Sequence, residues 1–267
     1  MFTLARLTLR RARQERLPQV AGSLAFTTLL SLVPLLAVSF ALFTRFPIFK
    51  PFALALEQHL LKGLLPPDIA RSVLKLLHTF TANAGGLTWA GSAFLLATAV
   101  AMLWTVERVF NQMWNVRKSR PLPMRMAMYL LVLALAPPLL GVSLWATSTV
   151  LGASLGWLGP LPPSAAFVLT LGPMALGWVG LSMLFYCVPN TRVRRRDAIV
   201  GGLIASVALE AGKRGFTAYV LKMPTYQAVY GAFAAFPVFL LWVYFSWLVT
   251  LAAALVAANL GRTPRAP

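Results

Sequence analysis

The sequence has few charged residues, and very few of them are acidic. Asp and Glu number 6 against 24 Lys and Arg, so the formal net charge is +18, and charged residues make up only 11% of the chain. Soluble domains carry about 25% charged residues. A soluble fold of 267 residues could not bury in one core the 59% that are hydrophobic, whereas lipid can surround them. The composition therefore indicates an integral membrane protein.

Cysteine and histidine are nearly absent as well. The single cysteine, Cys187, excludes a disulfide within the chain, and its apolar surroundings favour a packing role. Two histidines, His59 and His78, cannot form a histidine-rich metal site. The sequence contains no GxxxxGK[ST] phosphate loop, no HExxH, no GxSxG and no acidic pair placed to hold Mg²⁺ on a cytoplasmic face. We therefore expect no catalytic residues, no metal, no cofactor and no ATP-driven step.

Long apolar runs are what the sequence has in abundance. A transmembrane helix needs roughly 20 mostly apolar residues, because in lipid its backbone must be hydrogen bonded internally. Six windows meet this requirement, at about 20–43, 87–110, 126–151, 165–188, 198–220 and 231–260. The first is too long for a signal peptide and lacks a clear cleavage site, so we interpret it as a retained span. The sequence predicts a single all-α membrane domain, a polytopic bundle of about six helices.

Basic residues gather on one side of these windows. Fifteen of the 24 Lys and Arg lie before the first window, between the second and third, between the fourth and fifth, and after the sixth, while six lie in the other connections. The positive-inside rule therefore predicts that both termini are cytoplasmic. The same distribution favours membrane topology over nucleic-acid binding as the reason for the basic isoelectric point. One dense group is predicted to contact anionic lipids: Arg192, Arg194, Arg195 and Arg196.

The connection between the first two windows, residues 45–86, is the longest. Apolar residues recur in it at helical spacing, at Ile69, Val73, Leu76, Leu77 and Phe80, with polar residues on the opposite face. This pattern predicts a helical segment in the outer membrane interface, and a helix capping the bundle is the alternative. An envelope protein partner could dock on this segment.

Charged residues inside the fifth window form the first candidate site. One helical face carries Ser206, Glu210, Lys213, Arg214 and Thr217. Glu210 follows Asp197 by 13 residues, which is about 20 Å along a helix and past the middle of the bilayer. Ionisable groups at this depth are costly and are candidates for function. The alternative is structural, since Glu210 and Arg214 form a favourable i, i+4 pair.

A second polar group lies at the inner end of the second window. Glu107, Asn111 and Asn115 follow one another at i, i+4, i+8, with Arg108 beside Glu107. Such a stripe could line an entrance, or it could fasten helices through hydrogen bonds. The nearness of the headgroups favours the second interpretation.

Several segments resemble the YihY/BrkB family of bacterial inner-membrane proteins, once labelled ribonuclease BN. The resemblance rests on AGSLAFTTLLSLVPLL (21–36), WTVERVFNQMWNVRKSRP (104–121), VPNTRVRRRDAIVGG (188–202), EAGKRGFTAYV (210–220) and YGAFAAFPVFLLWVYFSWLVTL (230–251). It implies a six-span, all-helical inner-membrane protein with an envelope or virulence role. Family members often carry a Glu near the end of the last span, where this chain has Ala252, Ala253 and Ala254.

Three functions are compatible with these features. The first is transport or handling of an anionic or amphiphilic, lipid-like substrate without ATP, in which Lys213 and Arg214 bind the head group and Glu210 modulates them. The proline residues that interrupt the first, third, fourth and sixth windows are common beside membrane cavities. The second is a non-catalytic envelope assembly factor that uses the segment 45–86. The third, a membrane-bound ribonuclease, is disfavoured because the sequence lacks metal ligands and an acid–base pair.

Overall fold

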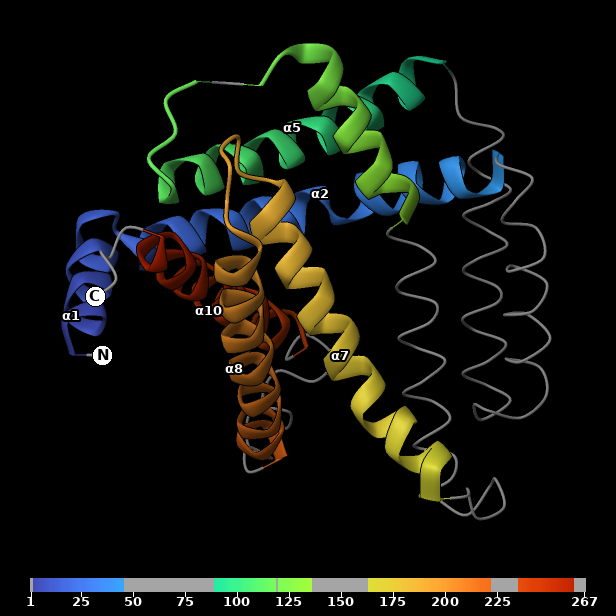
Figure 1. Ribbon diagram of the computed structural model, residues 1–267. Coiled ribbons are helices and arrows are strands. Elements are labelled where there is room, and N and C mark those ends of the chain that lie inside the picture. The colour runs from blue at the N-terminus through green and yellow to red at the C-terminus, as the bar shows by residue number, and fades with distance from the viewer. Residues whose placement is uncertain (1, 46–88, 119, 136–162, 222–234, 262–267) are drawn as a thin grey trace. The chain divides into compact units, whose positions relative to one another are not determined.

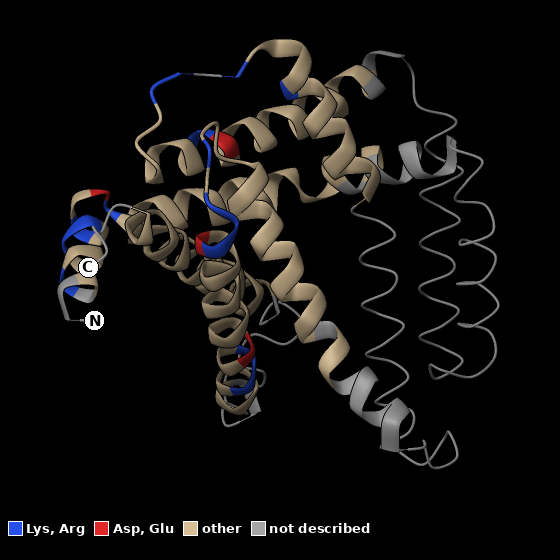
Figure 2. Cartoon of the chain, viewed as in Figure 1, with Lys and Arg blue, Asp and Glu red and all other residues tan. Residues whose placement is uncertain are grey.

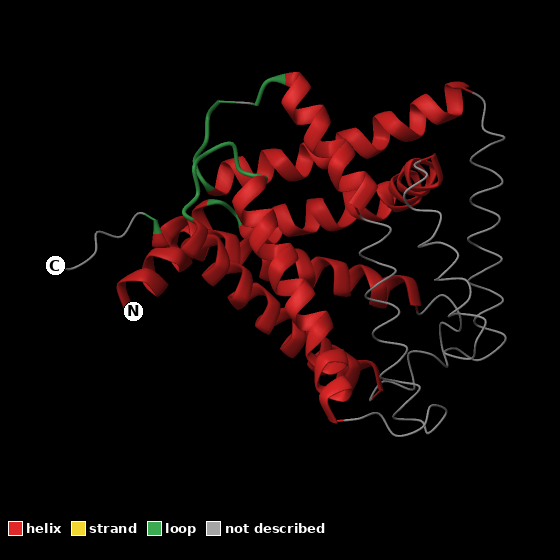
Figure 3. Cartoon of the chain, turned by 45° about the vertical axis from the view of Figure 1, so that its right-hand side comes forward, coloured by secondary structure: helices red, strands yellow, loops and turns green. Residues whose placement is uncertain are grey.

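The computed structural model describes residues 2–45, 89–118, 120–135, 163–221 and 235–261, and these residues are helical or form short connections. The helices are α1 (Phe2–Gln14), α2 (Leu17–Arg45), α5 (Trp89–Met113), α7 (Pro163–Cys187), α8 (Arg195–Leu221) and α10 (Ala235–Leu260). A further helical segment covers Leu122–Leu135. The described part of the chain contains no strand (Figure 3). The all-α prediction is confirmed.

Three of the described helices are long and apolar enough to cross a membrane: Leu17–Leu35, Ala93–Met113 and Phe236–Leu260. The segments Leu122–Leu135 and Met174–Cys187 are apolar but shorter over their described lengths. Together with α8, these helices fall in all six predicted windows. The chain is therefore a polytopic helical membrane protein. The third window is described only as far as residue 135, and the predicted outer segment 45–86 lies outside the described residues except for Arg45.

Large apolar side chains are exposed along these helices, as a lipid-facing surface requires. Phe26 is 61% exposed, Leu30 64% and Met183 62%. In water such surface would be unfavourable, whereas acyl chains solvate it at no cost.

The chain divides into two compact units, and the polar contacts described below all lie in one of them. This unit comprises residues 1–30, 102–120 and 177–267. It contains α1, the beginning of α2, the ends of α5 and α7, and the whole of α8 and α10. The other unit comprises residues 31–101 and 121–176.

Helices α8 and α10 pack closely as an antiparallel pair. At the start of α8, a Cβ added to Gly201 would lie 2.7 Å from Cβ of Ala257, near the end of α10. Toward the end of α8, a Cβ on Gly212 would overlap the ring of Phe245. Small residues let membrane helices approach one another, and the packing contacts then hold them together.

The same unit brings several helix ends to one place. The connection after α5 reaches the end of α7, because Nη2 of Arg120 donates to the carbonyl of Cys187 at 3.0 Å. The backbone N–H of Asn190, between α7 and α8, donates to Oδ1 of Asn111 on α5 at 2.7 Å. The connection after α5 and the connection between α7 and α8 therefore lie together. The count of Lys and Arg residues assigns both to the same side of the membrane.

Candidate functional site

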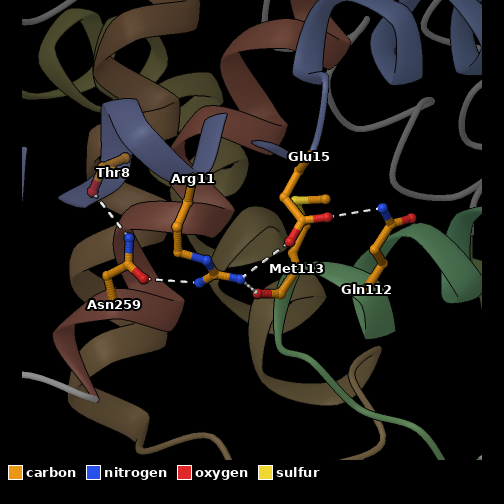
Figure 4. Close-up of polar contacts among 6 residues, drawn as sticks. All are labelled: Thr8, Arg11, Glu15, Gln112, Met113 and Asn259. Carbon is orange, nitrogen blue, oxygen red and sulfur yellow. Dashed lines mark hydrogen bonds and ion pairs between the residues drawn. The ribbon is translucent and has the colours of Figure 1, made fainter. Parts of the chain in front are cut away.

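Two groups of polar side chains stand out in this unit. The first, the end cluster, joins α1 to the ends of α5 and α10 and comprises Thr8, Arg11, Glu15, Gln112, Met113 and Asn259 (Figure 4). The second, the α8 triad, comprises Glu210, Lys213 and Arg214.

Arg11 is the centre of the end cluster. Its Nη1 donates to Oδ1 of Asn259 at 2.8 Å, and its Nη2 donates to the carbonyl of Met113 at 2.9 Å (Figure 4). Met113 is the last residue of α5, where helix carbonyls lack partners within the helix and carry partial negative charge. The guanidinium group therefore caps α5 while it binds α10.

The other members of the cluster extend this network. Asn259 is fully buried, and its Nδ2 donates to Oγ1 of Thr8 at 3.1 Å. Oε1 of Glu15 lies 3.7 Å from Nη2 of Arg11, and Oε2 of the same carboxylate accepts from Nε2 of Gln112 at 2.9 Å. A buried charge is tolerated when it is paired and hydrogen bonded in this way.

The end cluster was not predicted as a site. In the sequence Arg11 is one of five basic residues before the first predicted span. Two signals were present: Thr8, Arg11 and Glu15 share one helical face at i, i+3, i+7, and Asn259 is the only amide side chain in the last apolar window. Neither signal shows that Arg11 binds Asn259, because the two residues are 248 positions apart in the sequence.

The predicted stripe on α5 consists of residues in different environments. Glu107 is buried with 1% exposure, whereas the adjacent Arg108 is exposed. Asn111 accepts the hydrogen bond from Asn190 that fastens the α7–α8 connection. This contact is the helix-fastening role that the sequence left as one of two interpretations.

Asn115 ends α5 rather than lining an entrance. Its φ of 56° is in the left-handed region. The N–H of Asn115 donates to the carbonyl of Gln112, and the N–H of Val116 donates to the carbonyl of Asn111. These are the two hydrogen bonds of a Schellman motif, in which the left-handed position favours Gly or Asn.

The basic connection before α8 is exposed, as its predicted lipid contact requires. Arg192, Arg194, Arg195 and Arg196 are all exposed, and Figure 2 shows the basic residues gathered on this connection, on α1 and on the connection after α5. By contrast, the predicted packing role of Cys187 is wrong, because its side chain is exposed and only its carbonyl makes a described contact, with Arg120.

The α8 triad contains the predicted ion pair and a closer second one. Nε of Arg214 lies 3.8 Å from Oε1 of Glu210, and Nζ of Lys213 lies 2.7 Å from Oε2. The side chains are 30% exposed for Glu210, 58% for Lys213 and 82% for Arg214. Two cations thus share one carboxylate and remain open to a further anion.

The other two residues of the predicted polar face lie to either side of the triad. Ser206 is buried at 5% exposure, and Thr217 is exposed and donates through Oγ1 to the carbonyl of Lys213 at 2.9 Å. The predicted polar face is therefore packed against protein at Ser206 and exposed at Lys213, Arg214 and Thr217.

Aromatic side chains lie between α8 and α10 along the stretch of α8 that carries the triad. Gly212, which precedes Lys213, lies against the ring of Phe245. The rings of Phe216 and Trp242 have centroids 5.3 Å apart, and those of Trp242 and Phe245 are stacked at 5.9 Å. These rings lie where the same stretch of α8 packs against α10, on a different face of the helix from Lys213 and Arg214.

The comparison with known families agrees with this helical membrane architecture. Residues 8–266 match the family described as Virulence factor BrkB. The chain belongs to the BrkB family. The family match includes Arg11, Asn259 and the α8 triad, and it confirms the resemblance seen in the motifs.

Relatives of this BrkB-family chain are described as UPF0761 membrane proteins. One from Ralstonia nicotianae is 49% identical over 257 residues, covering 96% of this chain and 58% of the relative. One from a Janthinobacterium species is 46% identical over 251 residues, covering 94% and 58%. One from Bordetella petrii is 42% identical over 272 residues, covering 98% and 60%. The chain thus spans about three fifths of the length of these relatives. No solved structure matches it.

Proposed function

We propose that this BrkB-family protein binds an anionic amphiphile at the α8 triad and moves it across the membrane without ATP. The observation that carries the proposal is the pair of exposed cations, Lys213 and Arg214, far along a membrane helix. Glu210 follows the first residue of α8 by 15 positions, which is about 22 Å of helix. The hydrocarbon core is about 30 Å thick, so Glu210 lies in its far half, and Lys213 and Arg214, about 27 and 28 Å along the helix, lie near its outer edge.

Charge at this depth needs a partner. An ionised side chain at the centre of the hydrocarbon costs about 2.5–3.5 kcal/mol, and toward its edge the charge is still stabilised by water, protein or another charge. Glu210 compensates one of the two cations and leaves the triad with a net charge of +1. An anionic headgroup of matching charge would complete the compensation.

The surroundings favour an amphiphile over a small inorganic anion. Phe216, Trp242 and Phe245 offer apolar surface where the same stretch of α8 packs against α10. A molecule with a charged head and an apolar tail would fill both environments at once.

We further propose that the protein lies in the bacterial cytoplasmic membrane with both termini in the cytoplasm, and that it has no nuclease activity. The gathering of the basic connections at one end supports the topology. The alternative role, envelope assembly through the segment 45–86, stays a prediction, because that segment lies outside the described residues.

Fluorescent lipid translocation in proteoliposomes tests the transport proposal. We expect the protein to accelerate the flipping of NBD-labelled phosphatidylglycerol more than that of NBD-labelled phosphatidylcholine. Lys213→Gln with Arg214→Gln should slow the anionic lipid at least about tenfold, a loss near 1.4 kcal/mol. Arg117→Gln with Lys118→Gln removes the same charge from an exposed connection and should have little effect.

Two results would contradict the proposal. One is equal flipping of both lipids by correctly inserted protein, which would mean that the headgroup charge is not recognised. The other is an unchanged rate in the Lys213 and Arg214 variant, which would show that binding occurs elsewhere.

A further inference from the structure

Helix α1 lies where three membrane spans begin or end. The candidate span Leu17–Leu35 starts directly after α1, and the span Ala93–Met113 ends at the carbonyl that Arg11 binds. The span Phe236–Leu260 ends one residue after Asn259, the other partner of Arg11. Since the ends of spans lie at the membrane boundary, α1 lies at that boundary too.

The chain changes direction between α1 and α2. Arg16, between the two helices, has a φ of 49°, which breaks the helical path, and α1 turns sharply away from α2 in Figure 1. The carbonyl of Arg16 then accepts from the N–H groups of Gln19 and Val20 at the start of α2. Because α2 is a span, a helix turned sharply away from it runs along the membrane boundary rather than across the bilayer.

The two faces of α1 differ in chemistry. Thr8, Arg11 and Glu15 form the inner face that contacts α5 and α10. On the outer face Arg6 and Arg13 are exposed, and Leu9, three residues after the first and four before the second, is 66% exposed. Residues at these spacings are neighbours on a helix surface.

The outer face is basic without acidic compensation from its own helix. Arg6, Arg10 and Arg13 recur at i, i+4, i+7 and are all exposed. The segment Phe2–Gln14 contains no Asp or Glu, and Glu15, directly after it, is engaged by Arg11 and Gln112. A negatively charged surface at the membrane boundary would complement this face.

We infer that α1 is a surface helix whose arginine face binds the headgroups of anionic phospholipids while Leu9 inserts among the acyl chains. Among the arginines of α1, Arg11 is the one that points inward, and with Thr8 and Glu15 it fixes the helix to the spans. Membrane-surface helices place basic residues among the headgroups and apolar residues below them, and Leu9 lies at the edge of the arginine face, where it can do so. This inference is independent of the transport proposal, since it concerns the opposite part of the unit from the α8 triad.

Lipid-dependent thermal stability of the full-length protein in detergent tests the binding. Adding phosphatidylglycerol should raise the melting temperature of the wild type, and the same mole fraction of phosphatidylcholine should not. Arg6→Gln with Arg13→Gln should remove at least half of this rise. The matched double variant Arg117→Gln with Lys118→Gln, which removes two exposed charges from the connection after α5, should keep most of it.

Three outcomes would overturn the inference. Equal stabilisation by both lipids would show that charge is not recognised. An equal loss in the two double variants would show a response to net charge rather than to α1. Stabilisation by a short RNA oligonucleotide, without any by phosphatidylglycerol, would assign the arginine face to a different partner.

A spin label tests the position of Leu9. In a Cys187→Ser background, a nitroxide on Leu9→Cys in phosphatidylglycerol vesicles should be relaxed more by oxygen, which concentrates in lipid, than by a water-soluble nickel chelate. A label on Lys118→Cys should show the reverse. A Leu9 label as open to the nickel chelate as the Lys118 label would refute insertion, even if the arginine variants lose lipid binding.

Discussion

The guanidinium group of Arg11 and the side-chain amide of Asn259 are joined by a hydrogen bond of 2.8 Å, although the residues are separated by 248 positions. The bond connects the first described helix to the last. This bond is buried, and Nδ2 of the same Asn259 side chain donates to Oγ1 of Thr8, which is also on α1. Helix α1 and the end of α10 are thereby held together at one end of the helical unit.

Arg11→Ala should strongly destabilise the unit. The substitution leaves the buried Oδ1 of Asn259 and the carbonyl of Met113 without this donor, and losses of this type cost about 2–4 kcal/mol. Thermal unfolding in detergent measures the change. The matched control is Arg10→Ala, which removes an exposed neighbour and should change the stability little. Equal melting temperatures for the two variants would contradict the assigned role of Arg11.

The partner residue gives a second test of the same network. Asn259→Ala should also lower the stability, and the double variant with Arg11→Ala should lose less than the sum of the two single losses, because both remove one interaction. Additive losses would show that Arg11 and Asn259 act independently.

Gly202→Ala should destabilise the packing of α8 on α7. An added Cβ would lie 2.7 Å from the backbone N and 2.9 Å from Cα of Ser182, and a backbone cannot rotate away as a side chain can. Overpacking of this kind costs about 1–3 kcal/mol. Gly215→Ala in the same helix is the control, because nothing lies within 4 Å of its added Cβ, and it should leave the stability unchanged or raise it by up to about 1 kcal/mol. The same unfolding measurement ranks the two variants, and the opposite order would contradict the close α7–α8 contact.

The helices could be predicted from the sequence because each segment that crosses the lipid must satisfy its backbone hydrogen bonds within itself. A run of about 20 apolar residues must be helical in hydrocarbon wherever its neighbours lie. The Glu210–Arg214 pair was predictable for a similar reason, since i, i+4 spacing alone places the two side chains together. The shorter contact, from Lys213 to Glu210, depends on side-chain rotamers that spacing does not fix.

The end cluster depends on tertiary contacts that no local pattern contains. Arg10 and Arg11 are adjacent and chemically identical, yet Arg11 is buried and Arg10 is exposed. The difference arises because the ends of α5 and α10 offer a carbonyl and an amide to one face of α1 only. Asn115 is a related case, because its helical spacing with Asn111 suggested a continuous stripe where the helix in fact ends.

Asn115→Ala and Asn115→Gly should have different effects. The left-handed φ of 56° is unfavourable for alanine by about 1–2 kcal/mol and costs glycine nothing. We therefore expect Asn115→Ala to lower the melting temperature more than Asn115→Gly does. If alanine proved as well tolerated as glycine, the left-handed cap would not be present at this residue.

The gathering of helix ends predicts the labelling pattern of introduced cysteines. Lys118, Thr191 and Gly261 are exposed and lie near the ends of α5, α7 and α10. In a Cys187→Ser background, a cysteine at each should react with a membrane-impermeant maleimide in inside-out vesicles and not in intact spheroplasts, because the positive-inside rule places this end in the cytoplasm. A cysteine at Lys222, which the charge count assigns to the other side, should show the opposite pattern. If all three cysteines were labelled from outside, the three helix ends would still lie on one side of the membrane, but the orientation of the protein would be reversed. If one cysteine were labelled from the opposite side to the other two, the hydrogen bonds that join these helix ends would be contradicted.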